Sequence, residues 1–262
     1  MIDTHTHLYM PESYPGNEAE LAVRRAIEAG VSTMVLPNVD KDSIRSIENL
    51  RSAFPDNLYI CMGLHPTEVR DSWREDLDEI KKHINRPGVI GLGEIGMDLH
   101  EEESMCELQK RAFREQLTWA NQYELPVVIH QRAALKETLE ILQETLTDHV
   151  PAIVFHCFTE GPESVEAIRA VVPEAFFGIG GVCTFKNAPY LREALHSIGL
   201  NHIVLETDAP FLAPVPYRGK RNESAYIPII AKAIATELGI TQEEVASATT
   251  QNARKLFPAL PQ

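Results

Sequence analysis

Two histidines near the start of the chain, His5 and His7, are separated by a single residue in the segment Ile2-Asp3-Thr4-His5-Thr6-His7-Leu8. Residues two apart on a β-strand point to the same side, because side chains alternate between its faces. Two neutral imidazoles on one side can bind one metal ion. Other metal-competent side chains follow later apolar runs, namely Glu94, His130, His156 and Asp208. This pattern predicts a metal site that is assembled from the ends of several strands.

The elements that would position these residues are short apolar runs that alternate with segments of helical periodicity. The predicted strands are Met1–Leu8, Thr33–Pro37, Leu58–Gly63, Val89–Leu92, Val127–His130, Ala152–Phe155, Ala175–Ile179 and His202–Leu205. The predicted helices are 18–29, 41–53, 70–84, 103–122, 134–147, 162–172, 187–198 and 223–237, with a last helix that starts at a capping box from Thr241 to Glu244. Eight β/α units predict a (β/α)8 TIM barrel, formed by residues 1–262 as one domain.

An open, doubly wound sheet with a nucleotide crevice is the main alternative to the barrel. No G-x-G-x-x-G motif follows the first predicted strand, and no G-x-x-x-x-G-K-[ST] motif occurs in the chain. The chain has 24 Lys and Arg against 38 Asp and Glu, a formal charge of −14. This charge disfavours a protein that coats nucleic acid, but it allows an enzyme that binds phosphate at divalent cations, because these reverse the local field.

The chain shows no apolar run of the roughly 18–20 residues that cross a bilayer and no secretory signal. Its four cysteines are Cys61, Cys106, Cys157 and Cys183, and none of them forms a C-x-x-C pair. These features predict a cytoplasmic protein with reduced thiols and no membrane partner. Nothing in the sequence indicates an obligate protein partner.

In a (β/α)8 barrel the functional residues lie at the carboxyl ends of the strands. Four imidazoles and two carboxylates at these ends suit two divalent cations about 3.5–4 Å apart. Glu94 is the candidate bridge, since its carboxylate can give one oxygen to each ion. Imidazole and carboxylate ligands suit Zn²⁺, Mn²⁺, Ni²⁺ or Co²⁺, and carboxylate with water also allows Mg²⁺. Each residue taken alone has a purely structural interpretation, but the six together favour a metal site.

Further polar residues are candidates for substrate binding. His65, in Gly63-Leu64-His65-Pro66, is equally compatible with a structural role and with a substrate contact. Arg132 lies two residues beyond His130, so it can reach into the same barrel mouth and bind a phosphate oxygen. The dense basic run at Arg218, Lys220 and Arg221 is either a solvated loop or a phosphate-binding lip.

Several segments, spread in order over the whole chain, carry a resemblance to a known family. They are Asp3-Thr4-His5-Thr6-His7, Gly63-Leu64-His65-Pro66, Gly93-Glu94-Ile95-Gly96-Met97-Asp98, Pro126-Val127-Val128-Ile129-His130, Phe155-His156-Cys157-Phe158, Glu206-Thr207-Asp208-Ala209-Pro210 with Arg218 to Glu223, and Asn252 to Phe257. The sequence resembles the TatD family of metal-dependent deoxyribonucleases, within the amidohydrolase-like barrels.

The resemblance implies a barrel hydrolase with two divalent metals that cleaves phosphodiester bonds of DNA, often from the 3′ end. By position, it makes His5, His7, Glu94 and Asp208 the ligands of one metal. Glu94, His130 and His156 would hold the other.

Three positions depart from the family pattern. Ala133 stands where an acidic residue usually follows the arginine, Glu160 delays the glycine expected after His156-Cys157-Phe158 to Gly161, and Ser224 replaces a proline. All the expected ligands are retained.

We therefore expect hydrolysis of a phosphodiester by metal-activated water, with Asp208 as the general base and DNA as the transient substrate. Hydrolysis of a C–N or ester bond in a small molecule is the alternative. Related barrels with that activity often bridge their metals with a modified lysine, and no lysine occurs between Val89 and Asp98. A non-catalytic metal-bound scaffold is a third hypothesis, which Asp208 disfavours, because a structural site needs no base.

Overall fold

The computed structural model describes residues 1–100, 103–146 and 151–261. Its strands form one eight-stranded parallel sheet in the sequential order β1 to β8. The strands are β1 (Ile2–Asp3), β2 (Thr33–Pro37), β3 (Leu58–Met62), β4 (Val89–Asp98), β5 (Val127–Arg132), β6 (Ile153–Phe155), β7 (Phe176–Ile179) and β8 (Ile203–Leu205). Backbone contacts join the first and last strands: Thr4 N donates to Leu205 O over 2.9 Å, and Thr6 forms a parallel bridge with Ala209. The predicted (β/α)8 barrel is confirmed.

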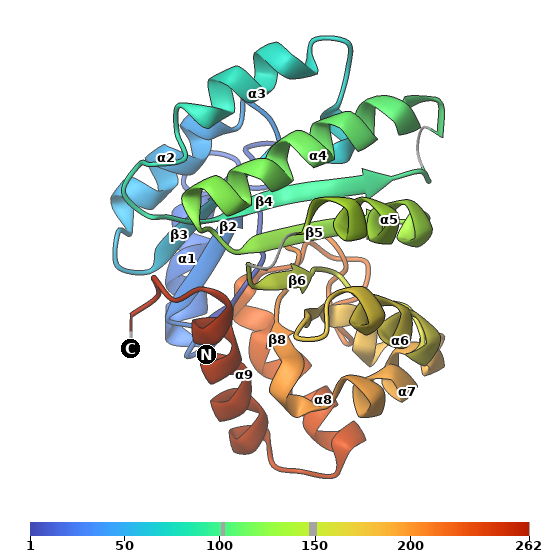
Figure 1. The fold of residues 1–262 in the computed structure, drawn as a ribbon. Coiled ribbons are helices and arrows are strands. Elements are labelled where there is room, and N and C mark those ends of the chain that lie inside the picture. Colours follow the sequence, from blue (N-terminus) through green and yellow to red (C-terminus); the bar gives the residue numbers. More distant parts are fainter. Residues whose placement is uncertain (101–102, 147–150, 262) are drawn as a thin grey trace.

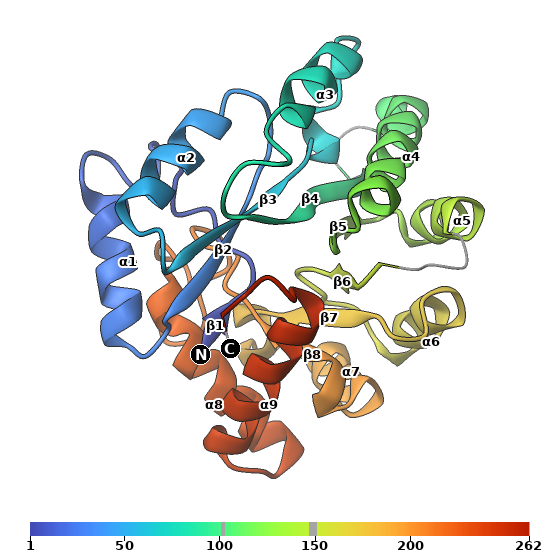
Figure 2. The ribbon, with the colours of Figure 1, turned by 60° about the vertical axis from the view of Figure 1, so that its left-hand side comes forward.

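Helices surround the strands (Figures 1 and 2). They are α1 (Glu18–Glu28), α2 (Ile44–Ala53), α3 (Trp73–Lys81), α4 (Cys106–Tyr123), α5 (Leu135–Thr145), α6 (Pro162–Val171), α7 (Pro189–Ile198), α8 (Ile227–Leu238) and α9 (Gln242–Leu256). Short 3₁₀ segments are η1 (Pro66–Glu68), η2 (Glu103–Met105), η3 (Gly181–Thr184), η4 (Leu200–His202) and η5 (Ser224–Tyr226). Among the described residues, no helix has the length and apolar character needed to cross a bilayer.

Helix α9 begins where the sequence predicts. The Thr241 side chain accepts a hydrogen bond from Glu244 N, and the Glu244 carboxylate accepts one from Thr241 N. These two bonds satisfy backbone donors that every helix start leaves unpaired. Helix α9 packs on β8 and β1, and in Figure 2 it lies across one end of the barrel instead of joining the outer ring.

The barrel interior begins, at the amino end, with an apolar layer to which each strand gives one buried residue. These residues are Ile2, Val35, Cys61, Ile90, Val128, Val154, Phe176 and Val204. Residues from α9 and the chain beyond it complete the cluster, namely Ala253, Leu256, Phe257 and Leu260. Gly91 leaves room for the Phe257 ring, because a Cβ at this glycine would lie 3.1 Å from a ring carbon. Helix α9 therefore closes the amino end of the barrel with apolar side chains.

The next layer of the interior is polar, and the two-residue period of a strand places it there. His130 lies two residues beyond Val128, and His156 lies two residues beyond Val154. Glu206 follows Val204 by the same spacing. Side chains two residues apart point to the same side. The strands that bury an apolar residue near their amino end therefore point a polar residue into the barrel near their carboxyl end.

Strand β2 has its predicted bounds, and β3, β5, β6, β7 and β8 differ from theirs by one or two residues at one end. Two strands differ more. Strand β1 covers Ile2–Asp3, whereas Met1–Leu8 was predicted, so His5 and His7 lie beyond its end. Strand β4 runs through Val89–Asp98 and is longer than the predicted Val89–Leu92, with a register shift between Leu92 and Ile95. The end of the helix predicted over 134–147 falls outside the described residues.

Candidate metal centre

The six predicted ligands converge at the carboxyl end of the barrel. Glu94 lies at the centre of the group, and its side chain is 3% exposed. His5 Nε2 lies 3.2 Å from Glu94 Oε2, and His7 Nε2 lies 3.8 Å from Glu94 Oε1. The two Nε2 atoms of His5 and His7 lie 3.2 Å apart. The expectation that both imidazoles face the same side is confirmed.

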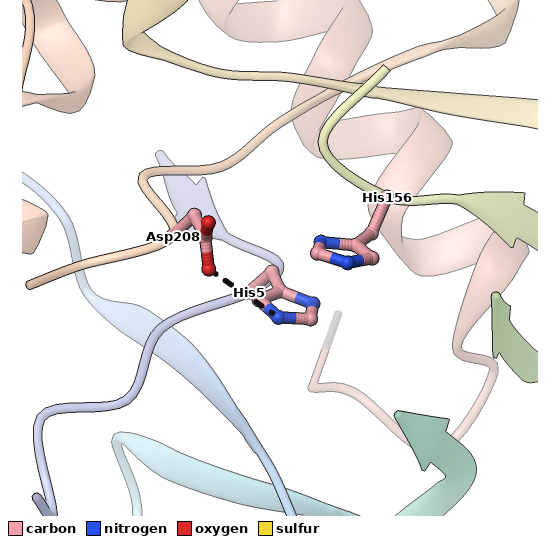
Figure 3. A group of neighbouring side chains, drawn as sticks. All are labelled: His5, His156 and Asp208. Atoms are coloured by element: carbon pink, nitrogen blue, oxygen red, sulfur yellow. Dashed lines mark ion pairs between the residues drawn. The ribbon is translucent and has the colours of Figure 1, made fainter. Parts of the chain in front are cut away.

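Asp208, beyond β8, lies against the same two histidines. Its Oδ1 atom is 3.5 Å from His7 Nε2 and 3.8 Å from His5 Nε2. Figure 3 shows Asp208 and His156 on either side of His5, and the His5 and His156 rings stack with their centroids 3.9 Å apart. These three residues form one set of potential ligand atoms, all within 4.8 Å of one another.

Two further histidines also lie close to Glu94. His156 Nε2 contacts Glu94 Oε2, and His130 Nδ1 lies 3.5 Å from the same oxygen. His130 Nδ1 and His156 Nε2 are 3.1 Å apart. Glu94 Oε2 therefore has nitrogens of His5, His130 and His156 around it, whereas Glu94 Oε1 faces His7.

The chemistry of this cluster fits a bound cation. Glu94 Oε2 is buried and accepts no hydrogen bond from the described residues, although imidazole nitrogens of His5, His130 and His156 surround it. A buried carboxylate oxygen without a hydrogen bond is costly. Lone pairs of neutral imidazoles and a carboxylate that point at one another are stabilised by a divalent ion. The residues present thus fit the divalent metals expected for the site.

Hydrogen bonds outside the cluster select the tautomer of two histidines. His7 Nδ1 lies 2.8 Å from the Tyr9 hydroxyl, which donates to Pro37 O, so Tyr9 accepts the His7 proton. His130 Nε2 lies 2.9 Å from Asp98 Oδ2, so its proton is also directed away from the site. The other ring nitrogen of each histidine then faces the cluster. Metal-binding histidines are commonly oriented in this way, by a hydrogen bond from the nitrogen that does not bind the metal.

His65 directs its ring proton into the site instead. Its Nδ1 atom accepts a hydrogen bond from Thr67 N, at 3.2 Å, so the proton of the neutral ring is on Nε2. That Nε2 lies 3.4 Å from Glu94 Oε1 and 3.2 Å from His130 Nδ1. His65, Glu94 and His130 are close enough to form a ligand set. The tautomer, however, makes His65 a hydrogen-bond donor to the site, and we favour that role over ligation.

Contacts between the first and last strands fix the position of Asp208. Asp3 Oδ2 accepts a hydrogen bond from the Thr207 hydroxyl over 2.6 Å, and Asp3 Oδ1 accepts from the backbone of Thr207 and His5. Asp208 N donates to His5 O over 2.9 Å, with Asp208 in the left-handed region at φ 54°. These bonds cross the seam of the barrel, so residues about 200 positions apart share one rigid frame.

The pKa shifts keep the cluster in states that suit a cation. Burial opposes ionisation of Glu94, but His156 and His5 outweigh it and hold the Glu94 pKa well below its usual range. Burial also opposes ionisation of Asp208, yet its hydrogen bond with His7 lowers the Asp208 pKa. Burial lowers the pKa of His5 to about 4 and that of His65 to about 3. Both carboxylates are therefore ionised near neutral pH, and these two histidines are neutral.

His130 and Glu206 behave differently. Burial acts to lower the pKa of His130, but the hydrogen bonds to Asp98 and Glu94 raise it to about 9. Without a cation His130 is therefore protonated near neutral pH, and a cation that binds to Nδ1 would displace the proton there. Burial, followed by the nearby Asp208, raises the pKa of Glu206 well above its usual range. Glu206 accepts a hydrogen bond from Cys157 N and occupies the space beside Gly178, where a Cβ would lie 1.9 Å from its Oε2 atom. It is a buried acid that supports the backbone after β6.

A cavity of about 630 Å³ opens above the cluster. Of the predicted substrate-binding residues, His65 and Arg132 line this cavity. Arg218, Lys220 and Arg221 of the basic run are not among the described residues that line this cavity. The Arg221 guanidinium pairs with Glu18 at 2.9 Å, and that of Arg218 lies 4.4 Å from the Phe185 ring centre. Lys220 lies 6.0 Å from the Tyr217 ring centre. Substrate contacts by these three residues stay a prediction.

Sequence reasoning missed Asp98, Tyr9, Arg70 and Phe211. A signal for Asp98 was present, because it follows Glu94 by four residues on one strand and so faces the same side. Arg70 and Phe211 line the cavity from loops. Periodicity carries no information on which loop residues face a barrel mouth, so no sequence signal distinguished these two.

Comparisons with known proteins agree with this geometry. The family model described as "TatD related DNase" matches residues 2–258. The chain is 38% identical to the metal-dependent hydrolase YabD of Bacillus subtilis, over 98% of each chain. It is 34% identical to the 3'-5' ssDNA/RNA exonuclease TatD of Pectobacterium parmentieri, over 92% of this chain and 93% of the relative. The crystal structure of the TatD homolog YJJV from Escherichia coli matches with a TM-score of 0.89 and 27% identity, over 99% of this chain and 98% of the other.

Proposed function

The chain belongs to the TatD family of metal-dependent hydrolases, and we propose that it cleaves phosphodiester bonds of nucleic acid with two divalent cations. One observation carries the proposal: imidazole nitrogens of four histidines lie around the two oxygens of an ionised, buried Glu94, with a cavity above it. A carboxylate with imidazoles around both of its oxygens could bridge two ions. The ions would supply an acidified water and positive charge for the phosphate.

The residues that would hold the cations follow from these contacts. His5 and His7 lie against Asp208 as well as Glu94, and these four residues would hold one ion. His130 and His156, whose facing nitrogens lie 3.1 Å apart beside Glu94 Oε2, would hold the second with the same carboxylate. Tyr9 and Asp98 each hold one of these rings in the tautomer that leaves a lone pair for a cation.

Asp208 is the candidate general base. Its side chain is 15% exposed, against 3% for Glu94, and it lines the cavity. The lowered pKa keeps Asp208 ionised, so one of its oxygens can accept the proton of the attacking water. His65 would donate its Nε2 proton to a phosphate oxygen that enters above Glu94.

The substrate class rests on the cavity and on the relatives. Arg132 and Arg70 both line the cavity and bring positive charge to a protein of formal charge −14. Guanidinium groups bind phosphate oxygens well. A relative that matches over most of the chain is named a 3'-5' ssDNA/RNA exonuclease. We therefore propose attack on a single-stranded 3′ end.

A direct test compares an oligonucleotide that has a 3′ overhang with a panel of amides and small esters. The protein is stripped with a chelator and reloaded with Zn²⁺, Mn²⁺, Ni²⁺, Co²⁺ or Mg²⁺. We expect loss of shortening from the 3′ end on stripping and recovery on reloading. Asp208→Asn should lower kcat by about 10²–10⁴-fold without unfolding the protein, since it removes the general base.

Asp56→Asn is the matched control, because Asp56 is an exposed aspartate in the turn before β3, at the other end of the barrel. It should shorten the oligonucleotide at the native rate. Cleavage of amides alone would overturn the nuclease proposal in favour of small-molecule hydrolysis. An Asp208→Asn protein with near-native turnover would remove the proposed base.

A further inference from the structure

Phe211 is a large apolar side chain left exposed next to the candidate metal centre. It is 51% exposed and lines the same cavity as His7 and Asp208. Its ring centre lies 6.4 Å from that of His7, with the two planes at 68°. Packing within the protein stabilises this ring only in part, because half of it is exposed. A bound ligand with an apolar face would cover the exposed half.

The backbone under this ring is held firmly. Phe211 N donates to Asp208 O over 2.8 Å. The amide nitrogen of Asn222, a residue with no exposed surface, donates to Phe211 O over 2.6 Å and to Thr207 O over 2.7 Å. The ring is therefore presented to the cavity by fixed backbone contacts, which is how a preorganised binding surface is built.

The cavity has two different walls. Met10 and Phe211 come from the loops after β1 and β8, which are neighbours across the seam of the barrel. Arg70 follows β3 and Arg132 ends β5, so the basic wall belongs to the opposite part of the ring of strands. Besides Glu94, Asp98 and Asp208 of the candidate metal centre, the lining has one more carboxylate, Glu68, two residues before Arg70. An apolar aromatic wall facing a basic wall matches a nucleotide, which has an aromatic base and a phosphate chain.

We propose that the ring of Phe211 stacks on a nucleobase next to the scissile phosphate, while the phosphate chain leaves over Arg70 and Arg132. This rests on the proposed function and adds the orientation of the strand. Within a strand a base is covered on both faces by its neighbours, so Phe211 would take a terminal or unstacked base. Every base has an aromatic face, so the contact tolerates any sequence.

The test is a cycle of two enzymes and two substrates. The substrates are matched single-stranded oligonucleotides, one with a normal 3′-terminal nucleotide and one with an abasic terminal sugar. The native enzyme should prefer the normal end through KM, by on the order of 5- to 150-fold, the usual worth of a base–aromatic stack. Phe211→Ala should lose this preference and treat both ends as the native enzyme treats the abasic one. A change in KM with an unchanged kcat marks a binding contact.

Two further variants separate stacking from a general effect of the substitution. Phe211→Trp should keep the preference, because it keeps an aromatic face. Tyr190→Ala removes another aromatic ring, 69% exposed on α7 and absent from the cavity lining, and should behave as the native enzyme does. An unchanged preference in Phe211→Ala, or none in the native enzyme, would overturn the proposal.

A binding measurement keeps this inference separate from the proposed function. Fluorescence anisotropy of the metal-loaded protein with the same two oligonucleotides, their last linkage a phosphorothioate, reads the base contact without turnover. If no oligonucleotide is cleaved, the nuclease proposal fails, and this arm still decides the stacking. Equal affinity of native and Phe211→Ala proteins for the normal end would then rule it out.

Discussion

At the amino end of the barrel Val128 and Val154 face apolar neighbours, whereas two residues further along the same strands His130 and His156 face Glu94. The strands and the direction of the side chains are the same in both layers. The amino-end layer is sealed by α9, and the carboxyl-end layer opens into a cavity. The amino-end layer thus contributes mainly to stability, and the carboxyl-end layer contributes mainly to the reaction. Substitutions in the two layers should therefore have different effects.

Phe257→Ala should have the largest effect on stability and little on the reaction. Phe257 is fully buried in the layer that α9 closes, beside Gly91. Removing a buried phenylalanine ring costs about 3–5 kcal/mol, because it loses apolar burial and leaves a cavity. Urea unfolding of the metal-free protein measures this change. At temperatures where the variant is folded, kcat/KM for oligonucleotide cleavage should be native.

Leu21→Ala is the control for this substitution, since Leu21 is 37% exposed on α1. Its free energy of unfolding should change by no more than about 0.5 kcal/mol. If Phe257→Ala were fully folded but inactive, the two layers would be coupled, and the division between stability and chemistry would be wrong.

Asp98→Ala should act on the other layer, through His130. Asp98 Oδ2 accepts the hydrogen bond of His130 Nε2, which leaves Nδ1 to face Glu94. Removing such an orienting carboxylate weakens metal binding by about 10- to 100-fold. Isothermal titration calorimetry of the metal-free protein with Zn²⁺ measures the affinity of the site for the ion. Asp98→Asn should be intermediate, because its amide oxygen can still accept the hydrogen bond, though without charge.

A purely structural role for Asp98 makes a different prediction. Asp98→Ala would then lower the free energy of unfolding while the affinity of the folded protein for Zn²⁺ stayed native. That result would leave His130 oriented by other contacts and would remove Asp98 from the site.

Much of the division between an apolar layer and a polar layer in the barrel can be derived from the sequence. The alternation of strands and helices gives the barrel, and the two-residue period turns His130 and His156 inward beyond Val128 and Val154. The same period could have identified Asp98 from Glu94. These features depend on local periodicity, which a single sequence records directly.

Long-range contacts explain what the sequence did not predict. The segment with His5 and His7 was expected to be a strand, but the Asp3 carboxylate, bonded to Thr207 across the barrel seam, shapes it instead. Arg221 pairs with Glu18, which is 203 positions away. No local pattern encodes such partners, so neither the loop that carries the ligands nor the direction of the basic side chain was predictable.

The smallest expected effect concerns backbone strain at the carboxyl end of the barrel. Ala133, Cys157, Asp208 and Leu212 all have positive φ angles between 46° and 55°, and they follow β5, β6 and β8. A left-handed conformation costs a residue with a Cβ roughly 1–2 kcal/mol, and glycine avoids this cost but loses more entropy on folding. Ala133→Gly should therefore raise the free energy of unfolding by about 0.5–1 kcal/mol in urea.

The neighbouring residue provides the control for this prediction. Ala134 has a φ of −143° and is almost fully buried at the start of α5, so Ala134→Gly relieves no strain and loses packing. It should lower the free energy of unfolding, the opposite sign to Ala133→Gly. Equal destabilisation by both glycines would mean that the turn after Arg132 stores no strain. Opposite signs would show that the catalytic end is held in position at a cost in stability, which the apolar layer beneath it offsets.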